Sequence, residues 1–342
     1  MPVSELLRNH GETISRGWRT RFTDAYPHAT MMLPPGECMP QSLIDATTWL
    51  LTNTPEDTTE LPEEARQRLR AIALDLRRTG FPAEEYPNTV RMLADEIRAA
   101  GDVGDLPVLD AAAEVMREAA SQMDHAGVPA ASAAQVTGVE DRDGVKIVRL
   151  EAGTRIAYAP GETLPVMSPA APGAWTGLIP ALPSNEFGQL EFHIGADTGI
   201  DVEPGAWLTV GSGRGGLQGV VDKHVLVVAA GTGLAAAKAL IFHWLERGER
   251  PEVHLVSDAT YDRAALDALA AAQNWLDVSW VVESRLGRPL EQVVSGAGMW
   301  WGRDVIVCAG EERAARLRDA VDGAKNVQVI AHDAVPEWFS AS

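Results

Sequence analysis

The residues best placed to bind a ligand are a Gly-Thr-Gly turn at one predicted strand-to-helix junction, where a phosphate could be held. Val225–Ala229 is a run of branched and small aliphatic residues, followed by Gly231, Thr232 and Gly233. An alanine-rich helix is expected to begin at Leu234. A buried strand that enters a helix through a glycine turn leaves backbone N–H groups free for a phosphate. Tight turns also need glycine for structural reasons, so the motif has two interpretations.

Asp258 is a second candidate, because it follows the next expected strand, Val253–Val256. Its carboxylate could accept hydrogen bonds from ribose hydroxyls, which would favour NAD over NADP. The same carboxylate could instead cap a helix. Elsewhere the chain has neither a Walker loop nor a nucleophile elbow with its serine, acid and histidine.

The formal charge of −19 excludes nucleic acid and anionic membranes as expected partners, because both are polyanions. Of the 342 residues, 46% are hydrophobic and 23% charged, and no apolar run is long enough to cross a bilayer. The N-terminal segment lacks an apolar signal core. The two cysteines, Cys38 and Cys308, are far apart and do not form a metal-binding spacing. We therefore expect a cytoplasmic protein with free thiols.

The chain divides into three expected domains. Residues 1–127 are predicted to be helical, 128–220 to form a small antiparallel β-barrel, and 221–342 to form a doubly wound α/β domain. The predicted helices are Ser4–Tyr26 (one or two helices), Leu43–Leu51, Pro62–Leu76, Ala83–Ala99, Leu106–His125, Leu234–Arg247 and Tyr261–Gln273, and the predicted strands are Val145–Leu150, Arg155–Tyr158, Leu190–Ile194, Trp207–Val210, Val225–Ala229, Val253–Val256, Val278–Val282, Val305–Cys308 and Val327–Ile330. A linker is expected at 128–134.

Short motifs in this order resemble the flavohaemoglobin family, in which a globin domain is fused to a ferredoxin-reductase-type module that binds FAD and NAD(P). The matching stretches are His10–Pro27, Gly80–Pro87, Tyr158–Glu162, Ala230–Ala235 and Cys308–Gly310. The resemblance implies a nicotinamide nucleotide at Gly231–Leu234. It also implies that the Cys308 thiol lies beside the nicotinamide, with Ala309 and Gly310 replacing the family's Gly-Pro. A buried thiol at a strand end could instead pack as a small hydrophobic residue.

The resemblance also predicts a globin fold without conventional haem. The family's iron-binding histidine lies on the helix just before the Gly-Phe-Pro turn, about ten residues ahead of the tyrosine that follows the turn. Counting back from Tyr86 gives Asp75 or Leu76 as the corresponding position. Neither residue can replace a neutral imidazole as axial ligand. The family's distal tyrosine corresponds to Trp18 or Arg19. The remaining histidines of the domain, at positions 10, 28 and 125, are expected at the surface or at helix ends.

The expected FAD contacts are also depleted. The family's Arg-x-Tyr-Ser strand corresponds to Thr176–Ile179, which has neither the arginine nor the tyrosine. The short flavin-binding helix is replaced by Gly195–Glu203. Trp175 and Trp207 could supply stacking surfaces, or could pack in the barrel. Tight FAD binding in the usual pose is therefore not expected.

Three functions remain open. In the first, NAD(P)H reduces a loosely held flavin while the globin is a scaffold or regulator. In the second, the chain is a non-catalytic sensor or interaction protein that responds to a nucleotide. In the third, relocated ligands support nitric-oxide dioxygenase activity. Electrons must pass from nicotinamide to flavin to haem in series. The loss of expected contacts for more than one of these cofactors therefore favours the second function on physical grounds.

Overall fold

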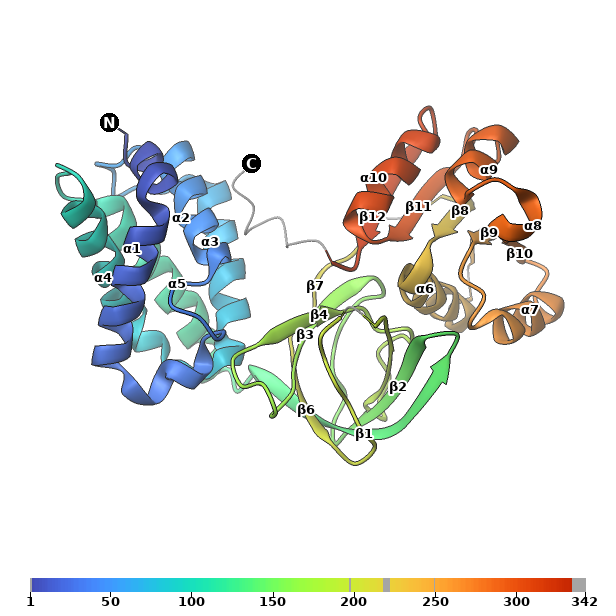
Figure 1. The fold of residues 1–342 in the computed structure, drawn as a ribbon, viewed down its shortest axis with the longest axis horizontal. Helices are drawn as coiled ribbons and strands as arrows, with labels where there is room; N and C mark the ends of the chain where they lie inside the picture. The colour runs from blue at the N-terminus through green and yellow to red at the C-terminus, as the bar shows by residue number, and fades with distance from the viewer. Residues whose placement is uncertain (1, 197, 218–221, 249, 334–342) are drawn as a thin grey trace. The chain divides into compact units, whose positions relative to one another are not determined.

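The computed structural model describes residues 2–196, 198–217, 222–248 and 250–333 (Figure 1). These residues form two compact units. The first is helical and contains residues 2–132 and 169–175, and the second contains the described residues of 133–168 and 176–333. The predicted boundary between 220 and 221 lies outside the described residues.

The helical unit is built from amphipathic helices that bury one apolar face each. Its elements are α1 (Val3–Ala25), η1 (Pro27–Met32), α2 (Gln41–Asn53), α3 (Glu63–Leu76), η2 (Arg77–Thr79), η3 (Ala83–Glu85), α4 (Tyr86–Ala100) and α5 (Pro107–His125). Helix α1 is one continuous helix, and its buried residues include Ile14, Trp18 and Phe22. The glycine that ends η2, Gly80, has a φ of +77°, which only glycine adopts at little cost. Across the described residues, none of the helices has the length and apolarity needed to span a lipid bilayer.

An antiparallel sheet forms the first part of the second unit. Its strands are β1 (Ala131–Arg142), β2 (Val145–Ala152), β3 (Glu162–Met167), β4 (Trp175–Leu178), β5 (Gln189–Ile194), β6 (Trp207–Gly211) and β7 (Arg214–Gly215). The order is β4-β3-β6-β1-β2-β5, with β7 paired to β3. An antiparallel bridge between Pro180 and Phe192 joins the segment after β4 to β5. This bridge brings the two ends of the strand order together, as in a barrel.

A five-stranded parallel sheet forms the rest of the second unit. Its strands are β8 (His224–Ala229), β9 (Glu252–Ser257), β10 (Leu276–Trp280), β11 (Asp304–Ala309) and β12 (Asn326–Ala331), and its helical segments are η4 (Gly231–Gly233), α6 (Leu234–Glu246), α7 (Arg263–Ala272), α8 (Glu283–Leu286), α9 (Leu290–Ala297) and α10 (Glu311–Ala320). The strand order β10-β9-β8-β11-β12 places the switch in winding direction between β8 and β11. Ligands of such sheets bind outside the carboxyl ends of the strands at this switch.

The predicted fold class is confirmed: a helical region precedes an antiparallel sheet and a doubly wound parallel sheet. Two local predictions are wrong. Residues 155–158 do not form a strand. There, the Ile156 carbonyl accepts a hydrogen bond from the Ser184 hydroxyl, and the Tyr158 hydroxyl donates to the Leu182 carbonyl. The expected linker instead enters β1 at Ala131, because burial of Ala134 against β2 outweighs the low strand propensity of alanine.

Candidate functional site

The glycine loop at the switch point has a structural requirement for both of its glycines. Gly231 has a φ of +55°, a left-handed conformation that costs other residues about 1–2 kcal/mol. Gly233 packs against β11 so closely that a Cβ there would overlap the carbonyl oxygen of Cys308. Both glycines therefore have a structural reason that does not depend on a nucleotide, and the close contact makes it stronger at Gly233.

Several polar groups of this loop already have partners. The Gly231 N–H donates to Asp258 Oδ1 at 3.2 Å, and the Gly233 N–H donates to the Ala230 carbonyl at 3.0 Å. Thr232 Oγ1 lies 3.1 Å from His332 Nε2. The structure thus brings together two candidates predicted separately, the glycine loop and Asp258.

Asp258 borders an open pocket of about 580 Å³ at the carboxyl edge of the parallel sheet. The pocket is lined by Asp258, Glu283, Pro289, Glu291, Gln292, Arg313 and Arg316. Arg313 bridges two of its acids, with Nη2 2.5 Å from Asp258 Oδ2 and Nε 3.1 Å from Glu291 Oε1. The pocket thus combines carboxylates, which accept hydroxyl hydrogen bonds, with guanidinium groups, which bind phosphate.

The predicted residues on β11 lie beside the loop but differ in accessibility. Cys308 is fully buried, and burial raises the pKa of its thiol to about 12. Ala309 is also buried, and its carbonyl accepts the His332 N–H at 3.3 Å. Gly310 precedes α10, and Leu234 is buried at the start of α6. Cys308 packs here as a small hydrophobic residue, so a ligand at this edge would meet backbone rather than its sulfur.

Sequence reasoning missed three residues around this edge: Arg313, His332 and Asp333. Asp333 Oδ1 accepts the Glu311 N–H at 2.6 Å and so caps α10. These residues have no motif spacing relative to the glycine loop. They reach it because parallel pairing of β11 with β8 and β12 aligns the three strand ends.

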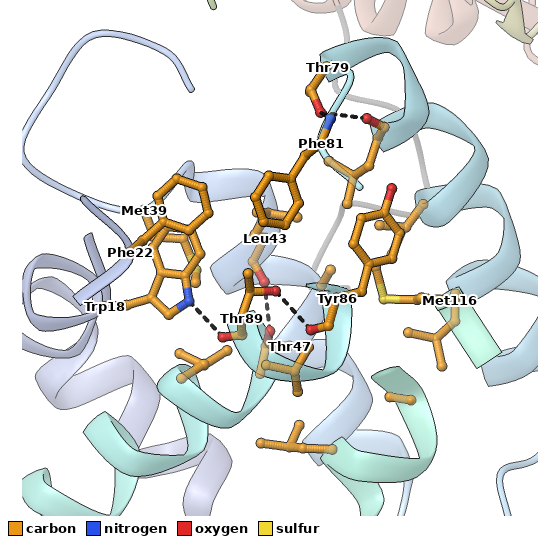
Figure 2. Close-up of a pocket in the computed structure, with 18 of the residues that line it drawn as sticks. Trp18, Phe22, Met39, Leu43, Thr47, Thr79, Phe81, Tyr86, Thr89 and Met116 are labelled. Carbon is orange, nitrogen blue, oxygen red and sulfur yellow. Dashed lines mark hydrogen bonds between the residues drawn. The ribbon is translucent and has the colours of Figure 1, made fainter. Parts of the chain in front are cut away.

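A second candidate site is a cavity of about 140 Å³ within the helical unit (Figure 2). Its lining comes from α1, α2, α3, α4, α5 and the segments between them: Trp18, Phe22, Met32, Leu33, Met39, Leu43, Ala46, Thr47, Leu50, Leu69, Ile72, Leu76, Thr79, Phe81, Tyr86, Thr89, Val90, Leu93, Leu109, Ala112 and Met116. Leu76, one of the two residues at the position expected for the haem ligand, lines this cavity. Trp18, at the expected distal position, also lines it.

The cavity lining does not fit haem. It contains neither histidine, cysteine nor a carboxylate, so nothing in it supplies the usual axial ligand apart from thioether sulfur and the Tyr86 phenol. Asp75 is buried in an ion pair with Arg78 and does not line the cavity. Burial raises the pKa of Tyr86 to about 12, which disfavours the phenolate that would bind iron. The helices therefore surround a cavity with a mainly apolar lining.

The strand expected to hold FAD lacks the usual contacts. In β4, Thr176 and Leu178 stand where the resemblance predicts the family's arginine and tyrosine, and a Cβ on Gly177 between them would crowd the Thr163 methyl. The guanidinium carbon of Arg78 lies over the Trp175 ring, 5.1 Å from the ring centroid. Residues 195–203 contain no helix among the residues described there. These residues do not fit the usual FAD pose.

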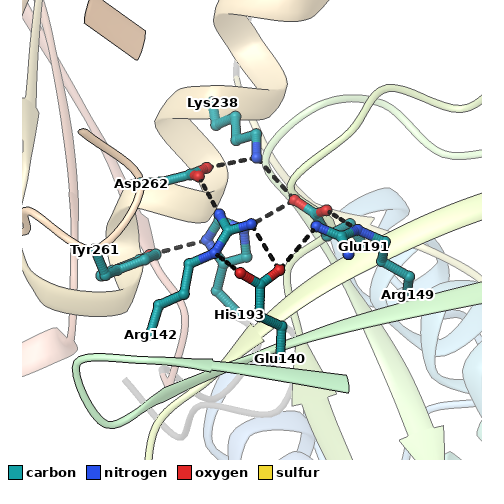
Figure 3. Close-up of polar contacts among 8 residues, drawn as sticks. All are labelled: Glu140, Arg142, Arg149, Glu191, His193, Lys238, Tyr261 and Asp262. Atoms are coloured by element: carbon teal, nitrogen blue, oxygen red, sulfur yellow. Dashed lines mark hydrogen bonds and ion pairs between the residues drawn. The ribbon is translucent and has the colours of Figure 1, made fainter. Parts of the chain in front are cut away.

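A buried ionic network joins the antiparallel sheet to the α/β region (Figure 3). Lys238 of α6 places its Nζ 2.8 Å from Glu191 Oε1 and 2.5 Å from Asp262 Oδ2, and all three side chains are at least nine-tenths buried. Two arginines complete the network: Arg142 contacts Asp262 at 2.6 Å, and Arg149 contacts Glu191 at 3.1 Å. Sequence analysis did not predict this network.

His193 is the neutral member of the network. Burial lowers its pKa, and its Nε2 lies 3.1 Å from Glu191 Oε1. Burial would raise the pKa of Glu191, but the His193 and Lys238 contacts outweigh it and hold that pKa well below 4.5. Since burial also raises the pKa of Tyr261, its phenol stays protonated, and its oxygen lies 2.8 Å from His193 Nδ1. The consistent assignment is Nε2–H donating to Glu191 and Tyr261 donating to Nδ1.

Glu191, His193 and Asp262 also have the composition of a metal site, with one potential ligand atom from each lying within 4.8 Å of the others. The Lys238 ammonium already binds both carboxylates, so it occupies the place of a cation. The cluster is therefore an ion-pair network that holds two parts of one unit together.

Because of this network, we expect the free energy of unfolding to decrease in acid. Both His193 and Glu191 have folded-state pKa values below their ordinary values of 6.5 and 4.5, so the unfolded chain binds their protons first. The stabilising contribution of these two groups is therefore fully present above about pH 6.5. Below that pH the free energy of unfolding falls as the unfolded chain takes up a proton first at His193 and then at Glu191. The fall is up to about 1.4 kcal/mol per pH unit for each proton. Urea unfolding between pH 7.5 and 4 measures this slope.

His193→Gln should flatten the decline between pH 6.5 and 5, although Glu140, Arg142, Arg149, Lys238, Tyr261 and Asp262 still surround the position. His224→Gln is the control, because His224 is an exposed histidine paired with Glu252. An unchanged slope in His193→Gln would contradict the assignment of the acid sensitivity to this residue.

Together these features define a class of fold: a helical unit with a central cavity, followed by a reductase-type antiparallel sheet and nucleotide-type parallel sheet. No family model matches the sequence, and a search of curated proteins found none with detectable sequence similarity. The fold class therefore rests on comparison with solved structures.

The chain is similar over its whole length to the flavohemoglobin of Malassezia yamatoensis, a structure with bound FAD and heme. The TM-score is 0.61, with 15% identity, 97% of this chain covered and 99% of the other. The ferredoxin reductase of carbazole 1,9a-dioxygenase is similar over 59% of this chain and 67% of its own, with 19% identity and a TM-score of 0.49. At 15% identity, the similarity to the flavohemoglobin shows a shared fold alone.

Proposed function

We propose that this protein binds a nicotinamide nucleotide at the carboxyl edge of its parallel sheet. The observation that carries the proposal is the pocket of about 580 Å³ that borders Asp258, whose carboxylate also contacts the glycine loop at the switch point. This is the location at which doubly wound sheets bind nucleotides. The oxidoreductase-like fold supports the same conclusion.

Each predicted residue has a role in this proposal. The loop Gly231–Leu234 and the N-terminus of α6 would face the pyrophosphate, with the Thr232 hydroxyl as an additional donor. Asp258 would accept hydrogen bonds from the adenine ribose. The backbone of Cys308, Ala309 and Gly310 would border the nicotinamide, because the Cys308 thiol is buried.

The charge of the pocket favours NADH over NADPH. Three carboxylates, from Asp258, Glu283 and Glu291, line it against the two guanidinium groups of Arg313 and Arg316. Arg313 is already paired with Asp258 and Glu291. A 2′-phosphate placed beside Asp258 would be repelled by the excess negative charge of the pocket. Ribose hydroxyls would instead donate hydrogen bonds to the Asp258 carboxylate.

We further propose that haem ligation and tight FAD binding have been lost. Leu76 in the cavity and Thr176 and Leu178 in β4 support this proposal. A non-catalytic, nucleotide-responsive protein is the second candidate function, favoured by the lack of a suitable iron ligand in the cavity. An NAD(P)H:flavin reductase or an active nitric-oxide dioxygenase would instead require relocated ligands.

Calorimetric titration of the full chain with NADH and NADPH tests the nucleotide site. NADH is expected to bind at least tenfold more tightly than NADPH. Asp258→Asn should weaken NADH about tenfold, the equivalent of one lost charge-assisted hydrogen bond, and reduce the preference over NADPH. Asp267→Asn is the matched control, because Asp267 is a half-exposed carboxylate paired with Arg263 on α7. Absence of binding for both nucleotides at millimolar concentration would overturn the proposal.

Visible spectra and NADH oxidation with added FAD separate the candidate functions. If the protein is non-catalytic, its spectrum should lack both a Soret band and a bound-flavin band. NADH with added FAD should then be oxidised no faster with the protein than without it. Steady NADH oxidation that depends on added FAD would favour the reductase, and a stoichiometric Soret band would favour the dioxygenase.

A further inference from the structure

The cavity of the helical unit has the chemistry of a ligand site of its own. Apart from Tyr86, its polar side chains donate to nearby carbonyl groups: Trp18 Nε1 donates to Thr89, Thr47 Oγ1 to Leu43, and Thr89 Oγ1 to Tyr86, at 2.7–2.9 Å. Thr79 Oγ1 likewise donates to the Leu76 carbonyl at 2.8 Å. A molecule inside the cavity would therefore meet aliphatic, aromatic and thioether groups.

Tyr86 does not change this character. Its hydroxyl has no hydrogen-bond partner among the described residues, and in Figure 2 it points away from Thr47 and Thr89. The charges that influence its pKa belong to Asp124, Arg77, Arg78 and Asp75, none of which lines the cavity. Its ring thus contributes to the cavity wall, and the charges that act on its hydroxyl belong to residues outside the lining.

The size and lining of the cavity identify the class of ligand. An apolar cavity of about 150 Å³ in another protein stays dry and binds benzene, and this one has about 140 Å³. Water would need two or more polar partners, and the lining leaves few. Aromatic rings of Trp18, Phe22 and Phe81 offer stacked or edge-on contacts, and the methionines can adjust to the ligand shape.

We propose that this cavity is a binding site for a small apolar molecule of about the size of benzene, of the aromatic-hydrocarbon class. Leu76 and Trp18, at the positions where the resemblance predicts the haem ligand and the distal residue, both line the site. It is independent of the nucleotide site, which lies in the other unit. Binding would stabilise the helical unit by mass action, because the unfolded chain has no such cavity.

Methyl NMR of the full chain tests the proposal with benzene as the probe. With methionine methyl groups labelled, the signals of Met32, Met39 and Met116 should shift on titration, because these residues line the cavity. The signal of Met31, which is 67% exposed, should not shift. Benzene at ten times its Kd should also raise the Tm of the helical unit by about 2–6 °C. If the signals of all three cavity methionines stayed unchanged up to the solubility limit of benzene, the proposal would be overturned.

Ala112→Leu provides the variant, because Ala112 lines the cavity and three added carbons would fill much of it. This variant should lose the benzene shifts, whereas the control Ala99→Leu, on the exposed side of α4, should keep them. Retention of the full shifts in Ala112→Leu would place benzene elsewhere and contradict the proposal.

A size series on the unmodified protein makes the test independent of that variant. Naphthalene, with a second fused ring, should shift the cavity methionines at least tenfold less than benzene at the same concentration. Equal binding of both molecules would contradict the size limit. Loading with hemin that gives a stoichiometric Soret band would show an iron site instead, and would also overturn the proposal.

Discussion

Replacement of Lys238 by methionine is expected to lower the free energy of unfolding by about 3 kcal/mol. The ammonium group lies between Glu191 and Asp262, whose side chains are 7% and 1% exposed. Without it, two buried carboxylates lose their shared cation in a region of low dielectric constant. Arg142 and Arg149 offset part of the loss, but they are 27% and 46% exposed and act through partly solvated groups.

Equilibrium unfolding in urea measures this change, and hydrogen exchange of the β5 amides reports whether the loss is located at the network. Lys146→Met is the matched control: Lys146 pairs with Asp201 at 3.2 Å, with side chains 43% and 86% exposed. Such an exposed pair contributes less than about 1 kcal/mol. Equal losses in the two variants would mean that the buried network does not stabilise the unit.

A second arm of this experiment separates burial of charge from loss of packing. The combined variant Lys238→Met, Glu191→Gln, Asp262→Asn removes the unpaired charges along with the cation. It should recover a measurable part of the stability, because replacing a whole buried ionic group costs less than removing one member. No recovery would indicate that the lysine stem, rather than its charge, accounts for the effect.

The order of secondary-structure elements could be predicted because it depends on local patterns. Branched aliphatic runs such as Val225–Ala229 predicted the parallel strands, and glycine or proline breaks predicted their ends. The strand β1 could not be predicted in the same way. Its first residues, Ala131–Ala134, are small, and they form a strand only because β2 and β6 surround them.

The buried network shows why the site was harder to predict than the fold. Lys238 lies within an alanine-rich helix, and Glu191 and His193 lie two positions apart in β5, where alternation puts them on one face. Neither pattern indicates a partner 47 residues away in the sequence. Such pairs depend on how the two sheets pack, which local periodicity does not contain.

The glycine loop illustrates a different limit. Its sequence, Gly231-Thr232-Gly233, fits a phosphate-binding turn, and it also fits a tight turn that the fold itself requires. The structure supplies a conformational reason for the first glycine and a packing reason for the second. The motif by itself therefore cannot decide the function, and the adjoining pocket beside Asp258 becomes the stronger support for nucleotide binding.

Gly233→Ala is expected to be strongly destabilising, by about 3 kcal/mol, because the added methyl group would overlap the Cys308 carbonyl and press β11 away from the loop. Both sides of this contact are backbone, in η4 and in the interior strand β11, and cannot move as a flexible side chain would. Gly231→Ala should cost only about 1 kcal/mol, since a φ of +55° is strained for alanine but its Cβ would meet no atom within 4 Å.

Gly248→Ala is the control, because Gly248 follows α6, has no positive φ and has open space where the Cβ would lie. Urea unfolding of the three variants should rank the losses with Gly233 first, Gly231 second and Gly248 smallest. If Gly233→Ala instead kept the stability of the unmodified protein and lost only nucleotide affinity, the glycine would be serving the ligand rather than the fold. The packing of the loop against Cys308 favours the first outcome, because that contact is present without a ligand.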